Sequence, residues 1–123
     1  MNQVKQSTAT NLPVYLRDSS TGNPKTGVAA GDVSAFYVKQ GQTTETSKTV
    51  VGNWTEIDAT NMPGIYTLAF TAGELDTLGV FMYTVKGTGI KQFDGMVQVV
   101  EYLPADLLQK IEDEDAEDDA RAH

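Results

Sequence analysis

Few side chains of this 123-residue chain are of the types that perform chemistry. The sequence has no cysteine, and its one histidine is the last residue, His123, so a nucleophile would have no positioned histidine base. Two carboxylate pairs remain, namely Glu56 with Asp58 and Glu74 with Asp76. Residues two apart on a strand share one face, where such carboxylates usually stay solvated. We therefore predict that the chain is not an enzyme and has no catalytic residues.

The sequence also gives little sign of a cofactor or metal site. The glycines stand singly in turn segments, and none opens a helix behind a strand as a phosphate-binding loop requires. Seven of the eight residues from 112 to 119 are acidic, but this run lacks the spaced aspartates and the glycine of a calcium-binding loop. We expect no cofactor and no specific metal site.

Charge divides the chain into two parts. Residues 1–103 carry nine acidic and seven basic side chains, whereas residues 104–123 carry eight acidic and two basic side chains. The formal net charge of the whole chain is −8. Binding to nucleic acid depends on Lys and Arg that neutralise phosphates, so we expect no nucleic-acid partner. The dense acidic run predicts a solvated, mobile tail beyond about residue 115, with docking on a basic partner surface or mimicry of DNA as the alternative.

Length and hydropathy predict one domain and no membrane span. A chain of this size forms a single core, and without cysteine its stability must come from packing and sheet hydrogen bonds. No apolar stretch approaches the length of a membrane helix, and Met1–Ser7 lacks the apolar run of a secretory signal, so we expect synthesis in the cytoplasm. We divide the chain into a β-domain over 1–103, whose residues 1–10 form an arm or edge strand, and a segment 104–123.

Alternating apolar and polar residues between turn signals predict an all-β body. We expect strands near residues 3–9, 11–18, 32–40, 47–51, 54–58, 65–71, 79–87 and 91–101. Short strands at this regular spacing indicate a β-sandwich. Pro63 and Gly64 favour a turn before the 65–71 strand. Thr71–Asp76 should make one helical turn, capped by its first residue, with Leu75 in the core.

The same alternation predicts which side chains form the core. The inward-facing set should be Tyr15, Phe36, Val38, Trp54, Tyr66, Leu68, Phe70, Leu75, Leu78, Phe81, Tyr83, Val85, Val97 and Val99. Burial of so many large apolar side chains is sufficient for the net stability of an ordinary single domain, without a disulfide or a structural metal.

A short helix is predicted to follow the last strand. Pro104 suits the first helical position, and Asp106 places a negative charge at the positive end of the helix dipole. Leu107, Leu108 and Ile111 then cluster on one side at spacings of three and four. We expect this apolar stripe to dock either on the domain itself or on a partner.

Several segments together resemble one known family. They are Trp54-Thr55-Glu56-Ile57, Pro63-Gly64-Ile65-Tyr66-Thr67-Leu68, Leu78-Gly79-Val80, Asp18-Ser19-Ser20-Thr21-Gly22, Gly31-Asp32-Val33 and the Phe93, Val97, Val99 spacing. In this pattern, over residues 4 to 101, the chain resembles the small immunoglobulin-like structural proteins of tailed bacteriophages. The resemblance implies an immunoglobulin-like antiparallel β-sandwich of about seven to eight strands. Trp54 would then be its central core aromatic, with sugar stacking as the alternative, and Tyr66 would pin the preceding turn through its hydroxyl.

The resemblance implies a non-catalytic structural role in a virion. We expect a capsid decoration protein that binds the major capsid protein or other virion proteins as a homo-oligomer or multicopy lattice. The alternatives are a neck, tail or baseplate adaptor or fibre-attachment protein, and a carbohydrate-binding module that needs Trp54 or a tyrosine exposed. Candidate partner contacts are the sheet edges, an arm around Val4 that adds a strand to a neighbour's edge, and the stripe of Leu107, Leu108 and Ile111.

Overall fold

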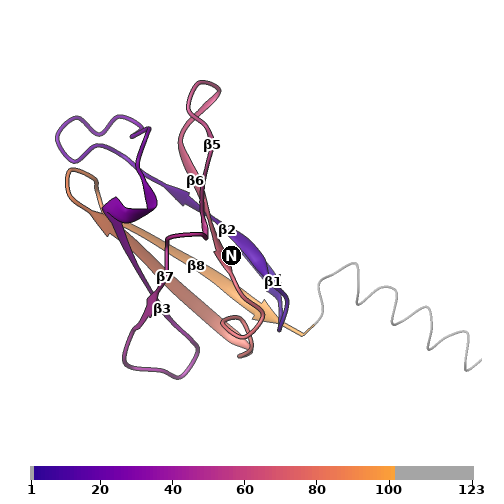
Figure 1. The fold of residues 1–123 in the computed structure, drawn as a ribbon. Coiled ribbons are helices and arrows are strands. Elements are labelled where there is room, and N and C mark those ends of the chain that lie inside the picture. Colours follow the sequence, from indigo (N-terminus) through magenta and orange to yellow (C-terminus); the bar gives the residue numbers. More distant parts are fainter. Residues whose placement is uncertain (1, 102–123) are drawn as a thin grey trace, which may run out of the picture.

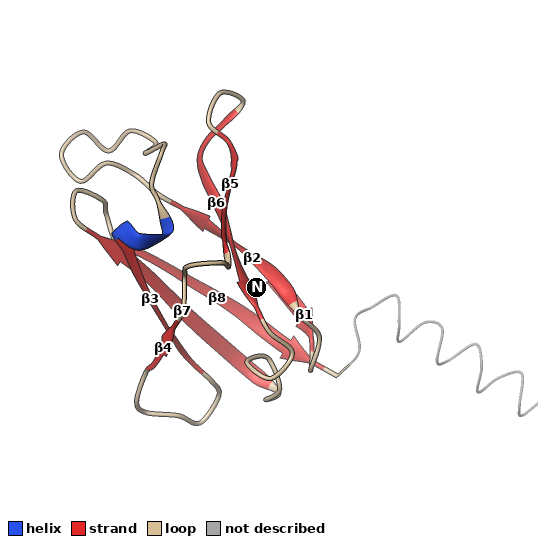
Figure 2. Ribbon diagram, in the orientation of Figure 1, coloured by secondary structure: helices blue, strands red, loops and turns tan. Residues whose placement is uncertain are grey.

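The computed structural model of the chain describes residues 2–101. Within them, eight strands form two sheets that pack against each other (Figure 1). The strands are β1 (Asn2–Lys5), β2 (Thr10–Tyr15), β3 (Val33–Val38), β4 (Thr46–Lys48), β5 (Trp54–Asp58), β6 (Met62–Phe70), β7 (Gly79–Gly87) and β8 (Phe93–Val100). A single 3₁₀ turn, η1 (Ala30–Asp32), is the one helical element of this region (Figure 2). The predicted all-β sandwich is confirmed, and the predicted helix and tail of 104–123 lie outside the described residues.

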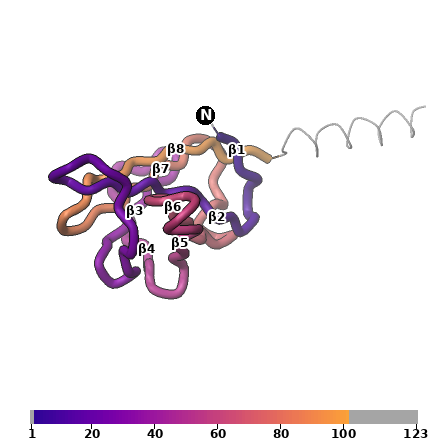
Figure 3. Tube along the Cα trace, turned by 90° about the horizontal axis from the view of Figure 1, so that it is seen from above, coloured from indigo at the N-terminus to yellow at the C-terminus, as the bar shows by residue number. Residues whose placement is uncertain are grey.

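The two sheets differ in size and in the direction of one strand. The larger sheet has the order β1-β8-β7-β3-β4, and the smaller has the order β2-β6-β5. Neighbouring strands are antiparallel except β1, which runs parallel to β8 with Val4 opposite Val99. β2 and β3 lie in different sheets, as do β6 and β7, so residues 16–32 and 71–78 connect the two layers (Figure 3).

Both sheets contribute to a core with an aromatic centre. Phe70 of β6 meets Phe81 and Tyr83 of β7 edge to face, with ring centroids 5.2 and 5.5 Å apart. Such pairs add to the stabilisation from burial alone. The predicted core residues that are buried are Tyr66, Leu68, Phe70, Leu75, Phe81, Tyr83, Val85, Val97 and Val99.

The inward face is predicted wrongly in two strands. In β2 the buried side chains are Leu12 and Val14, whereas Tyr15 is 51% exposed. In β3 Ala35 is buried, and Phe36 and Val38 are only partly covered on the other face. Because side chains alternate with a period of two, choosing the wrong residue of a neighbouring pair inverts the whole strand. β3 carries apolar residues at both positions of the alternation, so its sequence does not decide between the faces.

Two further residues predicted in the core lie at its margin. Leu78 precedes β7 and is exposed. Trp54, at the start of β5, is partly buried and packs against the core instead of at its centre. Further core residues that alternation did not select are Val4, Leu12, Leu16, Val33, Val50 and Ile90.

The turn between β5 and β6 lies earlier than the predicted Pro63-Gly64 position. The Asp58 carboxylate accepts two backbone N–H groups of the following residues at 2.9 and 3.0 Å, so the chain reverses over 59–61. Aspartate favours turns through such bonds. Gly64 instead lies within β6 at a φ of 82°, where a Cβ would come within 2.8 Å of the Leu16 carbonyl oxygen. Its role is to allow the β2–β3 connection to approach β6 closely.

The segment predicted as one helical turn after β6 forms a hydrogen-bonded turn, not a helix. The N–H of Thr71 donates to Glu74 Oε1 (2.8 Å), and the N–H of Glu74 donates to Thr71 Oγ1 (3.2 Å), which is a reciprocal cap. The N–H of Leu75 donates to the Thr71 carbonyl and closes the turn, and the Leu75 side chain is fully buried. The turn also places Glu74 Oε1 2.6 Å from Nζ of Lys48, which ties the β6–β7 connection to edge strand β4.

Candidate functional site: the outer face of the five-stranded sheet

The outer face of the five-stranded sheet carries apolar side chains in line across three strands. Val38 of β3 lies opposite Met82 of β7, and Met82 lies opposite Met96 of β8. Met82 is 45% exposed and Met96 is 49% exposed, whereas Val38 is partly buried. Directly opposed side chains on neighbouring strands lie close enough to interact. Val38, Met82 and Met96 therefore form one patch, which we call the outer row.

The outer row follows from an apolar run in β7. The four residues Val80–Tyr83 are all apolar. Phe81 and Tyr83 are buried in the core, so alternation directs Val80 and Met82 to the outer face. Strands that are apolar on both faces are typical of sheets covered on both sides. Met82 is nevertheless exposed among residues 2–101, so in this part of the chain only the inner face of β7 is covered.

Polar side chains continue the same face toward the β7–β8 hairpin. Asp94 accepts hydrogen bonds from Gln92 Nε2 (2.9 Å) and Thr84 Oγ1 (2.8 Å), which hold the pKa of its carboxyl below the usual value. Lys86 Nζ lies 5.3 Å from the centre of the Phe36 ring. An apolar centre with a polar, charged margin is the usual composition of a protein interface.

This face is suited to binding a protein surface. Methionine is flexible and polarisable, so Met82 and Met96 can adapt to an irregular partner.

Among residues 2–101, no three His, Cys, Asp or Glu side chains are placed to hold a metal ion. Over the same residues, the structure contains no helix long and apolar enough to cross a membrane.

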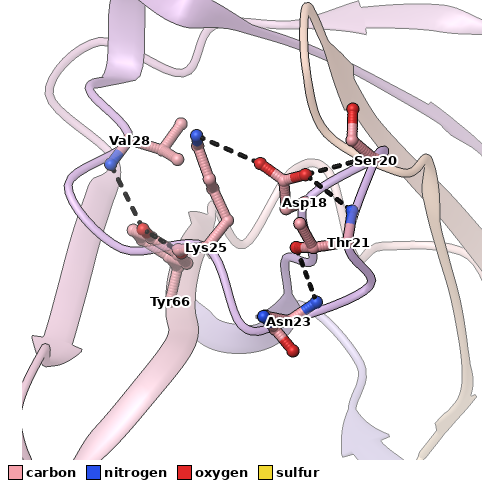
Figure 4. A network of polar contacts seen from close by, with 7 residues as sticks. All are labelled: Asp18, Ser20, Thr21, Asn23, Lys25, Val28 and Tyr66. Carbon is pink, nitrogen blue, oxygen red and sulfur yellow. Dashed lines mark hydrogen bonds and ion pairs between the residues drawn. The ribbon is translucent and has the colours of Figure 1, made fainter.

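A second surface lies at the end of the sandwich, on the β2–β3 connection (Figure 4). The Asp18 carboxylate accepts the N–H groups of Thr21 (3.0 Å) and Ser20 (2.8 Å) and lies 3.5 Å from Lys25 Nζ. The two backbone bonds, with the lysine, hold the pKa of Asp18 below its usual value. The N–H of Asn23 donates to Thr21 Oγ1 (3.3 Å). The connection is therefore held in shape by its own polar groups.

Tyr66 fixes this connection from the three-stranded sheet (Figure 4). Its hydroxyl donates to the Lys25 carbonyl (2.8 Å) and accepts the Val28 N–H (3.2 Å), while burial raises its pKa. The prediction that Tyr66 pins the preceding turn is wrong, because its hydroxyl reaches the β2–β3 connection. Trp54 stacks on Tyr66 with ring centroids 4.8 Å apart and donates its indole N–H to the Val28 carbonyl (2.9 Å). Both aromatic residues thus support the loop.

A pocket of about 420 Å³ opens beside this connection. It is lined by Lys25, Gly27, Val28, Gly31, Asp32, Thr88 and Ile90. In the described part of the chain, no buried side-chain nitrogen or oxygen lacks a hydrogen-bond partner. The pocket therefore presents no buried, unpaired polar group that would orient a ligand, and the outer row is the stronger candidate.

Of the residues predicted as partner contacts, Val4 lies in the described part of the chain and the other three do not. Val4 of β1 is only 6% exposed and packs into the core, so its side chain is not at the surface. Leu107, Leu108 and Ile111 lie outside the described residues, as does His123. The outer row was not selected from sequence, although the four-residue apolar run of β7 was a visible signal for it.

Each carboxylate of the two predicted pairs has a partner within the fold. Glu56 accepts a backbone N–H of the β2–β3 connection (3.0 Å), and Asp58 caps the β5–β6 turn. Glu74 pairs with a buried lysine of β4, and Asp76 Oδ1 accepts a hydrogen bond from Lys39 Nζ (2.9 Å). These carboxylates stabilise local structure.

Comparison with known proteins assigns no family to this geometry. No family model matches the chain, and neither a curated protein nor a solved structure is significantly similar to it.

Proposed function

We propose that this chain is a non-catalytic structural protein of a tailed-bacteriophage particle, which decorates the capsid shell by binding the major capsid protein. The outer row carries this proposal, because it is an exposed apolar patch on a sheet whose other face is already packed. Exposed patches of this kind mark sites of protein interaction. The sequence resemblance supports the assignment to a phage particle, and the exposure of the outer row supports its choice as the contact surface.

The finer assignment of the sandwich as immunoglobulin-like belongs to the same proposal. The order β2-β6-β5 corresponds to strands B, E and D of that fold, and β3, β7 and β8 correspond to C, F and G. The chain has no cysteine for the disulfide that joins strands B and F in antibody domains. Val14 and Val85, on the two corresponding strands, are both fully buried in the core.

Decoration requires only a modest affinity for each copy. A shell presents many equivalent sites at high local concentration, so weak contacts combine into stable attachment. The apolar outer row would form the centre of each contact. Asp94 and Lys86 at its margin would favour one orientation, because charged rim groups contribute more to specificity than to affinity.

Copy number and position in the particle test the proposal. Particles that contain this chain are purified, the chain is quantified against the major capsid protein, and its density is located by electron microscopy. We expect a ratio of one or a simple fraction, with density on the shell. A few copies at a single vertex would instead support the alternative of a neck, tail or baseplate adaptor. Absence from particles would overturn the virion assignment.

Two matched variants test the contact surface itself. Met82→Glu with Met96→Glu places charges in the outer row, whereas Ile57→Glu with Met62→Glu charges two similarly exposed apolar residues on the smaller sheet. We expect the outer-row variant to fail to bind particles that lack this protein, while the control variant binds like wild type. Equal binding by both variants would remove the outer row from the contact.

Among residues 2–101, the carbohydrate-binding alternative depends on Tyr15, because Trp54 is engaged with Tyr66 and Val28. Tyr15 is 51% exposed and meets Phe93 edge to face, with ring centroids 5.5 Å apart. Calorimetric titration with cell-surface polysaccharide of the host would support this alternative if wild type binds and Tyr15→Ala does not. If neither wild type nor Tyr15→Ala gives a heat of binding, the carbohydrate-binding alternative is excluded.

A further inference from the structure

β1 is held to the rest of the domain by few contacts. It is a four-residue strand at the end of the larger sheet, and its one neighbour there is β8 (Figure 3). Of its side chains only Val4 is buried, whereas Asn2 and Gln3 are exposed. Val4 is thus the one side chain that β1 buries in the core, and the aromatic centre of the core lies on β6 and β7.

The link from β1 to β2 is short and strained. Residues 6–9 carry the chain from the larger sheet to the smaller one. Ser7 has a φ of 55°, in the left-handed region that residues with a side chain seldom adopt. Its N–H donates to the Leu75 carbonyl (2.9 Å), and the Gln6 side chain donates to the Asp76 carbonyl (2.8 Å). A short hinge under strain favours exchange of the strand that it holds.

We propose that β1 exchanges between two copies of this chain. In the exchanged form, β1 of one copy pairs in parallel with β8 of the other, with Val4 opposite Val99 as it is within one chain. The acceptor edge and the Val4 site are identical in both forms, so exchange keeps the pairing with β8 and the burial of Val4 and allows Ser7 to relax. Because exchange is bimolecular, it increases with concentration, and a surface that holds copies side by side favours it most.

Cysteine trapping between two separately tagged proteins tests this exchange and needs only purified protein. The chain has no native cysteine, so each introduced thiol is unique. Gln3 and Gln98 are exposed and lie opposite each other on β1 and β8, at the spacing a disulfide accepts. One protein carries Gln3→Cys and the other carries Gln98→Cys, so a disulfide between them requires β1 of the first at β8 of the second.

The matched control pairs a Met82→Cys protein with a Met96→Cys protein, because both positions are exposed as Gln3 and Gln98 are. Met82 and Met96 are also opposite each other, but β7 lies inside the sheet and cannot leave it without unfolding. After incubation and mild oxidation, we expect the Gln3→Cys and Gln98→Cys mixture to give at least several-fold more mixed disulfide than the Met82→Cys and Met96→Cys mixture, with a yield that rises with concentration. Equal yields in the two mixtures, or no dependence on concentration, would overturn the proposal.

Ser7→Gly tests the role of the hinge. Glycine adopts a φ near 55° without steric strain, so the variant stabilises the closed form relative to the exchanged one. We expect the mixed disulfide of the Gln3→Cys and Gln98→Cys mixture to fall several-fold when both proteins carry Ser7→Gly. An unchanged or higher yield would show that strain at Ser7 does not drive exchange.

Discussion

The two faces of the five-stranded sheet are built from neighbouring residues of the same strands but have different surroundings. On the inner face of β7, Phe81 and Tyr83 are almost fully buried against Phe70 of the smaller sheet. On the outer face, Met82 is about as apolar as these residues but remains 45% exposed, and Thr84 bonds to a neighbouring carboxylate. The inner face holds the sandwich together, and residues 2–101 leave Met82 and Met96 of the outer face exposed.

The difference shows that apolar character alone does not identify the core. A residue stabilises the fold when the opposite sheet covers it, and the same kind of residue one position along the strand contributes little until a partner arrives. Substitutions at adjacent positions of β7 should therefore separate stability from binding.

The largest contrast is expected between Phe81→Ala and Met82→Ala. Phe81 is fully buried between aromatic rings, so its truncation should cost about 3 to 5 kcal/mol of the free energy of unfolding. Met82 is exposed, so its truncation should cost less than about 1 kcal/mol. Urea denaturation measures both values. Similar losses for the two variants would contradict the assignment of Met82 to a free face.

The next largest difference in stability is expected between the charged contacts of a buried lysine and those of an exposed lysine. Lys48 Nζ lies 4.9 Å from the centre of the Phe70 ring, its side chain is only 3% exposed, and it pairs with Glu74. Glu74→Gln leaves this ammonium without its counter-charge and should cost roughly 2 to 4 kcal/mol, near the range for a broken buried pair. Lys86→Gln removes an exposed contact with Phe36 and should cost below about 1 kcal/mol. Thermal unfolding of both variants gives the comparison.

The Lys48–Glu74 pair also predicts how stability depends on acid. Burial alone would raise the pKa of Glu74, but hydrogen bonds from Lys48 and Thr71 outweigh it and lower the pKa. A lowered folded-state pKa means that the stabilisation is complete above the unfolded-state pKa and is lost as pH falls through the folded-state pKa. Unfolding free energies measured down this pH range should fall less in Glu74→Gln than in wild type. Parallel curves would show that the pair does not contribute.

A smaller effect is expected from Tyr83→Phe, compared with Thr84→Val. The Tyr83 hydroxyl donates to the Pro13 carbonyl of β2 (2.6 Å), so its loss should cost about 1 kcal/mol. Thr84 bonds to Asp94 on the exposed face, and its replacement should change stability by less than about 0.5 kcal/mol. Chemical denaturation of the two variants at neutral pH measures this difference. A larger loss for Thr84→Val would contradict the contrast between the faces.

Burial raises the pKa of Tyr83 to about 12. Its stabilisation is therefore complete below the unfolded-state pKa and is lost as pH rises through the folded-state value. Alkaline unfolding followed by circular dichroism should be less steep in Tyr83→Phe than in wild type. Identical alkaline profiles would show that the tyrosine ionises without opposing the fold.

The existence and approximate position of the strands could be predicted from sequence because alternation and turn residues are local signals. The choice of face could not be predicted where both positions of the alternation are apolar, as in β3. There the pairing with β7 decides, since Ala35 lies opposite the buried Val85 and Phe36 lies opposite Thr84. Such pairing is a long-range property that a local pattern does not contain.

The candidate site was partly visible in the sequence. The apolar run Val80–Tyr83 indicates a strand that is apolar on both faces. The alignment of Met82 with Val38 and Met96, however, depends on the register of three strands. Tyr66 was recognised as a structural hydroxyl, yet its partners lie in a loop that approaches only after folding. Hydrogen bonds between distant segments were therefore the least predictable part of the molecule.

Oxidation of methionines in assembled particles tests the central claim most directly. Met82 and Met96 of the outer row and Met62 of the smaller sheet are similarly exposed, so dilute peroxide should oxidise all three in the free protein. In purified particles, peptide mass spectrometry should find Met82 and Met96 protected from oxidation, while Met62 is oxidised at the same rate as in the free protein. Equal oxidation of all three in the particle, or protection of Met62 alone, would contradict the assignment of the outer row as the contact with the shell.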